Sequence, residues 1–212
     1  MKPTFPRGLY ALTPHEPETG ALVRKVRLAL AGGAVAVQYR NKHASAALRR
    51  QQAAALARTC AEAGVPLIVN DDVTLALEVG AAGVHLGRED GDLAAARQRL
   101  GPGRLLGASC YDRLELAAAA VAAGADHVAF GAVYPSPTKP DAVRAPLTLI
   151  AEAQRRLAVP VIAIGGITLE NAGEVIRAGA DALAVITALF DAGDIAARAR
   201  AFRQLFTTTE AA

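Results

Sequence analysis

Eight short apolar runs, separated by segments of helical character, are the feature that most limits how this sequence can fold. Each run has the length of a buried parallel strand, and parallel strands need a crossover, usually a helix, between them. Strand and helix alternating eight times predict an α/β fold, a single (β/α)8 TIM barrel. The runs lie at residues 9–13, 34–40, 66–71, 83–87, 105–110, 127–133, 159–166 and 182–187.

The segments between the runs carry helix signals, such as an early Ser or Glu and a late Arg. The clearest helical segments are residues 45–63, 73–80, 113–123, 169–178 and 194–206. An Ala-Gly or Val-Gly pair precedes several strands, as expected where glycine ends a helix in the left-handed conformation. The 212 residues are near the lower end of the size of one barrel. We therefore expect one domain over residues 1–212, with 207–212 as a frayed tail.

Composition excludes several classes of protein. Apolar residues make up 52% of the chain and aromatic residues 4%, so the core must consist of Ala, Val, Leu and Ile. No apolar run approaches 18 residues and the N-terminus has no secretory pattern, which predicts a cytoplasmic protein without a membrane partner. The net charge of +3 is spread over many helices, which argues against nucleic acid. Cys60 and Cys110 form no CxxC motif and suggest neither zinc nor a disulfide framework.

Two acids follow consecutive predicted strands and should lie close together. Asp71 ends one strand and Asp90 follows the next, and the ends of successive parallel strands emerge at one rim. Two carboxylates about 4 Å apart repel by roughly 4 kcal/mol at an effective dielectric of 20. A hard cation such as Mg²⁺ would remove this repulsion. The alternative is that both acids only cap the following helices.

Other polar residues follow the remaining strands, at the rim where barrels place their active sites. Residues 38–42 combine two cations, two amides and an aromatic ring, and Ser109 ends a later strand. A loop with three prolines carries Ser, Thr and Lys at 134–141 and looks like a stiff clamp for a charged ligand, although surface turns share this composition. The seventh strand ends in Gly165 and Gly166 and the eighth in Ile186 and Thr187, and many barrels bind phosphate in the loops after these strands.

These features together predict a monophosphate pocket opposite a second anion site with Mg²⁺ ligands. Joining one monophosphate to one Mg²⁺-bound diphosphate, with loss of pyrophosphate, is the simplest reaction for such a pair of sites. The four histidines form no catalytic pattern. His85 sits inside a strand and is expected to be a packed core residue, and His15, His43 and His127 have no evident partners.

The motifs closely resemble those of thiamine phosphate synthase, also called thiamine-phosphate pyrophosphorylase. In family order and over nearly the whole chain, they occupy residues 33–42, 69–71, 83–90, 130–139, 163–167 and 184–187. The resemblance implies a TIM barrel that couples 4-amino-5-hydroxymethyl-2-methylpyrimidine diphosphate to 4-methyl-5-(2-hydroxyethyl)thiazole phosphate, or to its carboxylated precursor. Thiamine phosphate and diphosphate would be the products, formed by a dissociative mechanism.

The resemblance also implies roles for individual residues. Asp71 and Asp90 would hold Mg²⁺, and Arg40, Lys42, Ser109 and Lys139 would be catalytic. The pyrimidine diphosphate would be bound by Gln38, Tyr39, Arg40, Asn41, Lys42, Asn70, Ser109 and Lys139. The thiazole phosphate would be bound by Ser136, Pro137, Thr138, Gly166, Ile186 and Thr187.

This sequence departs little from the family pattern. Thr187 stands where Ser is frequent, and Asn41 stands where an acid is common, which leaves the role of Asn41 open. Two alternatives stay open: a related thiazole tautomerase, which handles only the thiazole phosphate and needs no metal site, and a non-catalytic barrel that binds phosphate. Retention of Asp71, Asp90 and Lys139 favours the synthase. The expected partners are small-molecule substrates, and a homo-oligomer is compatible with the sequence.

Overall fold

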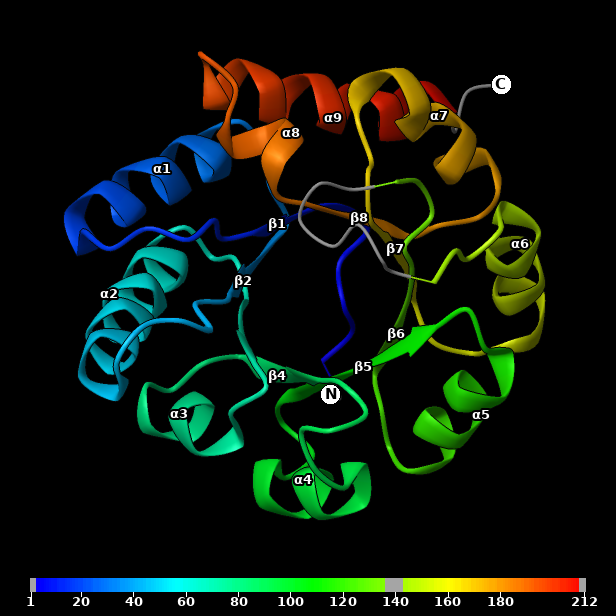
Figure 1. Cartoon of the computed structure of the whole chain (residues 1–212), viewed down its shortest axis with the longest axis horizontal. Helices are drawn as coiled ribbons and strands as arrows, with labels where there is room; N and C mark the ends of the chain where they lie inside the picture. Colours follow the sequence, from blue (N-terminus) through cyan, green and yellow to red (C-terminus); the bar gives the residue numbers. More distant parts are fainter. Residues whose placement is uncertain (1–2, 136–142, 210–212) are drawn as a thin grey trace.

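The computed structural model describes residues 3–135 and 143–209 and forms a closed barrel of parallel strands surrounded by helices (Figure 1). Each strand pairs with the next, and β1 pairs with β8. The predicted TIM barrel is therefore confirmed. The strands are β1 Gly8–Leu12, β2 Ala36–Tyr39, β3 Leu67–Asn70, β4 Gly83–Leu86, β5 Leu105–Tyr111, β6 His127–Phe130, β7 Val161–Ile164 and β8 Ala182–Val185.

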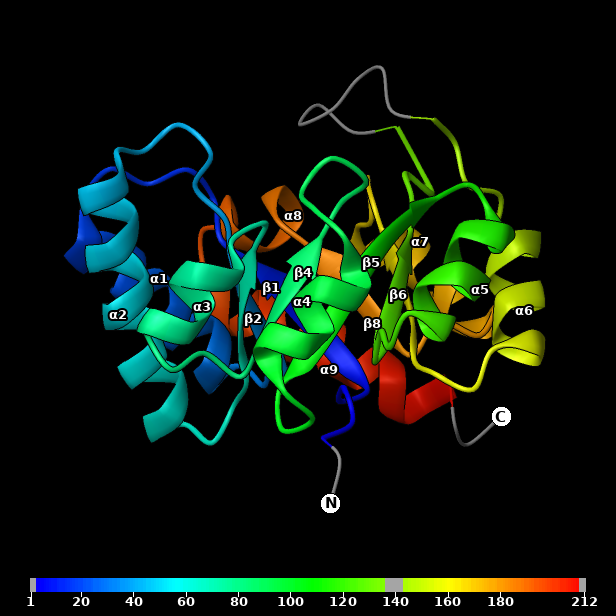
Figure 2. The same ribbon diagram turned by 90° about the horizontal axis from the view of Figure 1, so that it is seen from below.

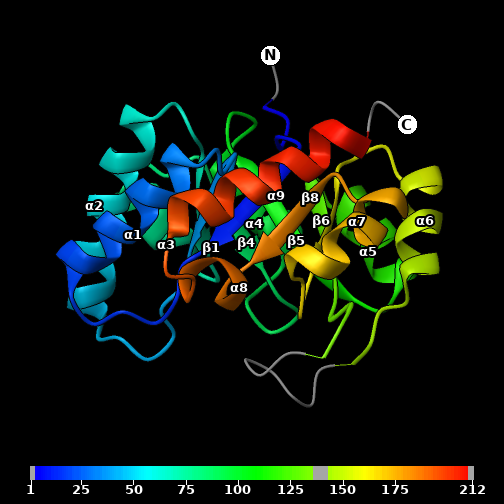
Figure 3. The ribbon, with the colours of Figure 1, turned by 90° about the horizontal axis from the view of Figure 1, so that it is seen from above.

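The helices fill the connections between strands and also close the chain. They are α1 Thr19–Ala31, α2 Ala46–Glu62, α3 Val73–Glu78, α4 Leu93–Leu100, α5 Leu114–Ala122, α6 Leu147–Arg156, α7 Leu169–Arg177, α8 Thr187–Phe190 and α9 Ile195–Thr209. Ser45 caps α2 as expected, its hydroxyl accepting a hydrogen bond from the Leu48 amide at 3.2 Å. Helix α9 packs against β1, α1 and α7 (Figure 3). Because α9 continues to Thr209, the expected frayed tail is wrong for its first three residues.

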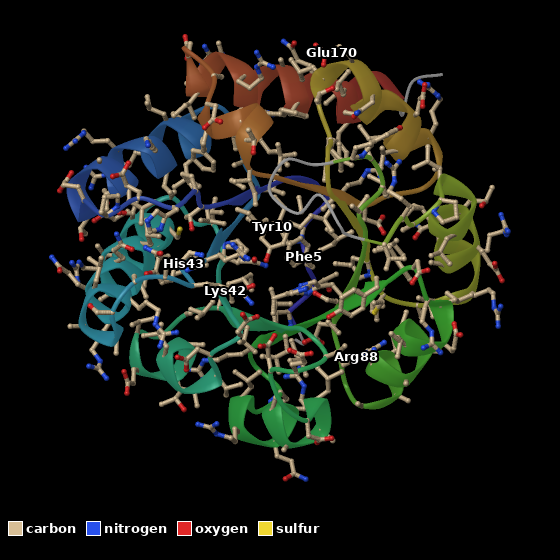
Figure 4. The ribbon with its side chains drawn as sticks, in the orientation of Figure 1. Phe5, Tyr10, Lys42, His43, Arg88 and Glu170 are labelled. Atoms are coloured by element: carbon tan, nitrogen blue, oxygen red, sulfur yellow. The ribbon has the colours of Figure 1, made fainter. Side chains whose placement is uncertain are left out.

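Side chains alternate between the two sides of the barrel wall, as they must in a strand. Outward residues such as Leu9 and Val37 form the large core between strands and helices. Inward residues such as Tyr10 and Ile68 fill the middle of the barrel. Phe5 joins this inner cluster, its ring edge-on to Tyr10 with 4.9 Å between centroids, and both residues lie within the ring of strands in Figure 4.

The two ends of the barrel differ. The N-terminal segment enters at one end, and the loops that follow the carboxyl ends of β2 and β4 emerge at the other (Figure 2). The inner cluster around Phe5 therefore closes one end of the barrel and leaves a cavity for the opposite end. No helix within the described part of the chain is long and apolar enough to cross a membrane.

Candidate active site

A cavity of about 660 Å³ lies at the carboxyl ends of the strands. This volume is within the range of small-molecule sites. Both predicted groups of ligand-binding residues contribute to its wall, so the structure brings them together in one space. Seven predicted residues line it: Gln38, Arg40, Asn70, Ser109, Gly166, Ile186 and Thr187.

Strand alternation decides which residues of the β2 motif reach the cavity. Gln38 points inward, and its amide Nε2 donates to the Tyr10 hydroxyl at 2.9 Å. Tyr10 also lines the cavity, and complete burial raises the pKa of its hydroxyl, which therefore stays protonated. No sequence motif singles out Tyr10, although its inward position in β1 is consistent with a place in the cavity wall.

Tyr39 does not line the cavity, which corrects its expected role as a substrate contact. As the neighbour of Gln38 in β2, it points to the other side of the wall and packs in the outer core. Its hydroxyl donates to the Gln52 side-chain oxygen at 2.9 Å, and burial raises its pKa to about 12. Tyr39 therefore anchors α2 to β2.

The Asn41 side chain is likewise directed into the protein, which corrects its expected role in binding substrate. Its Nδ2 donates to the Gln52 oxygen at 3.0 Å, and its Oδ1 lies 2.9 Å from His15 Nδ1. With 6% of its surface exposed, Asn41 has both ends of its amide occupied. The contact also corrects the expectation that His15 has no partner. This pattern indicates that Asn41 holds the loop after β2 in place.

Asp71 and Asp90 lie close together, as predicted. The Asp90 carboxyl is near enough to Asp71 to perturb its titration, and Lys42 Nζ is 2.8 Å from Asp71 Oδ2. Burial, opposed by Lys42 and reinforced by Asp90, raises the pKa of the Asp71 carboxyl. The Asp90 carboxylate accepts from the Gly87 amide at 2.8 Å. Lys42 is seen on the loop after β2 in Figure 4.

The helix-capping alternative for these two acids is wrong. The N-cap of α3 is Asp72, whose carboxylate accepts from the Leu75 amide at 2.8 Å. Helix α4 is capped in the same way by Asp92. Asp71 instead adopts a positive φ of 65°, a conformation that Asp and Asn tolerate better than most residues.

Asp71 and Asp90 fit a hard divalent cation. Carboxylate oxygens are the ligands that Mg²⁺ prefers, and a cation would relieve the repulsion that helps to raise the Asp71 pKa. Residues 3–135 and 143–209 contain no cluster of three or more His, Cys, Asp or Glu suited to a metal. A cation here would therefore need other ligands, such as substrate oxygens, in addition to the two acids.

The opposite wall of the cavity contains Gly166 and Thr187. Gly166 has a φ of 64°, and a Cβ there would lie 2.3 Å from the Pro135 carbonyl oxygen. Packing between the loops after β6 and β7 therefore requires glycine, in addition to any need for a ligand to approach the backbone. Asn171 Nδ2 donates to the Gly166 carbonyl at 3.0 Å and fixes the loop. Thr187 begins α8 at the end of β8.

Four predicted residues, Ser136, Pro137, Thr138 and Lys139, lie outside the described residues. The flanking Pro135 and Val143 both line the cavity.

Two histidines are buried, as expected for His85, but make contacts that the sequence did not predict. His85 lines the cavity, and its Nε2 lies 3.0 Å from Ser109 Oγ. Its Nδ1 lies 3.4 Å from Nε2 of His127, which corrects the expectation that His127 has no partner. Burial lowers the pKa of His85 to about 4 and that of His127 well below its usual value, so both rings are neutral near pH 7. Tyr111, given no role from the sequence, also lines the cavity.

Comparison with known proteins shows which family this chain resembles. Residues 9–189 match the family model described as thiamine monophosphate synthase. The chain is 59% identical over 206 residues to the thiamine-phosphate synthase of Aromatoleum aromaticum, covering 97% of this chain and 99% of the relative. For the thiamine-phosphate synthase of Thiobacillus denitrificans the identity is 57% over 203 residues, with 96% of each chain covered.

A solved structure is also similar to this chain in both fold and sequence. Thiamine phosphate pyrophosphorylase from Pyrococcus furiosus superposes with a TM-score of 0.86 at 35% identity, covering 95% of this chain and 96% of that one. Both the sequence and the fold thus match the same kind of enzyme. The chain therefore belongs to the thiamine monophosphate synthase family of enzymes.

Proposed function

We propose that this enzyme joins 4-amino-5-hydroxymethyl-2-methylpyrimidine diphosphate to 4-methyl-5-(2-hydroxyethyl)thiazole phosphate, or to its carboxylated precursor. The products are thiamine phosphate and diphosphate. The observation that carries the proposal is the single cavity. It is lined on one side by Gln38, Arg40, Asn70 and Ser109 and on the other by Gly166, Ile186 and Thr187. Two substrates bound on these two sides would meet within one enclosed space.

In the proposed reaction, the bond between the pyrimidine methylene carbon and the diphosphate oxygen breaks first, and the oxygen keeps the electron pair. The ring nitrogen of the thiazole then donates its lone pair to the methylene cation, which forms the new carbon–nitrogen bond. No external oxidant or acid is needed for this exchange. Charge on the leaving diphosphate is what the protein must stabilise.

Basic side chains beside the cavity suit that task. Arg40 lines the cavity, and Lys42, two residues further along the chain, lies 2.8 Å from Asp71, which follows the cavity residue Asn70. Mg²⁺ held by Asp71 and Asp90 would supply further positive charge toward the diphosphate oxygens. Gln38, Asn70 and Ser109 are inward polar groups that can orient the pyrimidine. Lys139 and the thiazole phosphate contacts at 136–138 belong to the same proposal, on the family pattern alone.

A thiazole tautomerase is the second candidate. It would use only the thiazole side of the cavity, so that Lys42 and the Asp71–Asp90 pair would have no function there. Burial of Asp71 beside Asp90 raises the pKa of Asp71 and disfavours its ionised form, and a bound cation would offset this cost, which favours the synthase. Small molecules are the proposed partners, in the cytoplasm, and a homo-oligomer is compatible with this role.

The test is direct. Purified protein with Mg²⁺ and both substrates should form thiamine phosphate and diphosphate in equal amounts, and should form neither when one substrate is omitted. Conversion of the thiazole phosphate alone, without release of diphosphate, would favour the tautomerase. Absence of both reactions would refute the proposed function.

A further inference from the structure

Three neighbouring strands place two histidines and a glycine in one row inside the barrel. His85 in β4 is paired in register with Gly107 in β5, and Gly107 is paired with His127 in β6. All three face inward, since strand alternation puts Val84 and Leu106 in the outer core. Ser109, two residues beyond Gly107, faces the same side and lines the cavity.

Gly107 allows the two imidazole rings to meet across β5. His85 Nδ1 and His127 Nε2 are 3.4 Å apart, and the ring centroids are 5.5 Å apart. A Cβ on residue 107 would lie 2.1 Å from His127 Nε2 and 2.5 Å from His85 Nδ1. Any side chain at this position would therefore separate the rings.

The hydrogen bonds continue from the rings to the cavity. His85 Nε2 is 3.0 Å from Ser109 Oγ, so His127, His85 and Ser109 form a chain of three. Neutral imidazole has one N–H donor and one acceptor nitrogen, so a single choice of tautomer sets the direction of the whole chain. In one direction His85 donates to Ser109, and the serine proton is free for a ligand. In the other, Ser109 donates to His85 and offers a ligand only lone pairs.

The far end of the chain favours the first direction. His127 Nδ1 is buried without a hydrogen-bond partner among the residues that the structure describes, and the Phe5 ring lies against the imidazole with 4.3 Å between centroids. Buried N–H groups without a partner are rarer in proteins than buried acceptors without one. This favours the tautomer of His127 in which Nδ1 carries no proton and the proton is on Nε2, facing His85.

We propose that His127 and His85 are positioning residues that hold the Ser109 hydroxyl as a hydrogen-bond donor toward an acceptor nitrogen of the pyrimidine ring. The substrate part of this inference rests on the proposed function. The low pKa values of both histidines agree with it, because a protonated ring would donate from both nitrogens. His127 itself does not line the cavity and acts only through His85.

The direction of the chain can be measured without any substrate. Protein labelled with ¹⁵N-histidine reports the tautomer of each ring by NMR at pH 7.5, with His85→Gln and His127→Gln used to assign the signals. We expect His85 and His127 both to carry their proton on Nε2. A proton on Nδ1 of either ring would overturn the inference, whatever the enzyme's activity.

Kinetics with matched variants tests the positioning role. His127→Phe keeps a ring but removes the donor, and His127→Gln restores an amide donor. We expect the phenylalanine variant to raise the KM for the pyrimidine diphosphate about tenfold, the size of one lost hydrogen bond, without changing the KM for the thiazole phosphate. The glutamine variant should recover most of this loss. Equal effects on both substrates, or equal behaviour of the two variants, would mean a merely structural role.

A substrate analogue tests the acceptor. Each of the two pyrimidine ring nitrogens is replaced by CH in a separate analogue. For one of these analogues, Ser109→Ala should no longer weaken binding. For an analogue in which hydrogen replaces the 4-amino group, Ser109→Ala should still weaken binding. The reverse pattern would overturn the proposed direction. If the parent protein forms no thiamine phosphate, the proposed function and the pyrimidine contact fail together, while the NMR result still decides the direction of the chain.

Discussion

Replacing Asp71 by Asn tests whether Asp71 is a metal ligand or a residue of purely structural importance. Asn keeps the shape of Asp and tolerates the φ of 65°, so the backbone should not change. The substitution removes the negative charge beside Asp90 and the ion pair with Lys42, whose side chain is 46% exposed. Such an exposed pair contributes at most about 1 kcal/mol.

The sign of the effect on stability follows from the raised pKa of Asp71. A carboxyl that binds its proton more tightly when folded than when unfolded lowers the free energy of unfolding at every pH above its unfolded pKa, which includes pH 7. The neutral Asn avoids this penalty. Without metal, we therefore expect the variant to have a free energy of unfolding equal to or above that of the parent.

With Mg²⁺ and inorganic diphosphate the order should reverse. A ligand at about 100 times its Kd stabilises the folded state by about 2.7 kcal/mol. For a chain of this size, each kcal/mol raises Tm by roughly 2–4 °C, so the parent should gain about 5–10 °C. The variant should gain little. Its kcat should fall by about two orders of magnitude or more if the lost charge stabilisation is at least about 3 kcal/mol.

The matched control is Asp72→Asn. This neighbouring acid caps α3, and Asn is an equally good cap, so the control should keep the activity and the Mg²⁺-dependent rise in Tm. Thermal unfolding with and without Mg²⁺ and diphosphate, beside a turnover assay with EDTA, completes the test. An Asp71→Asn enzyme with parental activity, or a parent that makes thiamine phosphate in EDTA, would refute the metal site.

Three further substitutions test the rest of the site. Thr187→Val should raise the KM for the thiazole phosphate by about one to two decades, because it removes a hydrogen bond to a charged group. An unchanged KM would mean that Thr187 is not part of the site. Lys139→Ala should mainly lower kcat, as expected for a contact with the departing diphosphate, and turnover at the parental rate would contradict this. Gly107→Ala should lower the free energy of unfolding, measured in urea, by about 1–3 kcal/mol, because the added methyl group would clash with the His127 ring. An unchanged free energy of unfolding would contradict the close packing of His85, Gly107 and His127.

The architecture could be predicted because it depends on local patterns. Apolar runs of strand length, alternating with helical segments, leave few topologies other than a barrel. The ends were less certain, since strands stop where their ladder partners stop: the run at 159–166 contains only Val161–Ile164 as β7. Helix α9 likewise exceeds its expected end because nothing in Thr207 or Thr208 ends a helix.

The site was predicted by position along the chain, which does not reveal where each side chain points. All of residues 38–42 were assigned to the substrate, yet Gln38 faces the cavity while Tyr39 and Asn41 contact Gln52 behind it. Strand alternation explains Tyr39 and could have been applied to the sequence. Asn41 lies beyond the strand, where alternation no longer holds, and its orientation depends on Gln52 and His15, which only the fold brings near.

The histidine pair could not be inferred from spacing at all, because His85 and His127 are separated by the whole of β5. Their contact depends on the register of three strands, and on a glycine between them that leaves room for two rings. A histidine in an apolar run is ordinarily a packed core residue, and these two are indeed buried. Burial keeps the rings neutral, and a neutral ring has a direction, since one nitrogen donates and the other accepts. The same burial that made these residues look inert is therefore what enables them to orient Ser109.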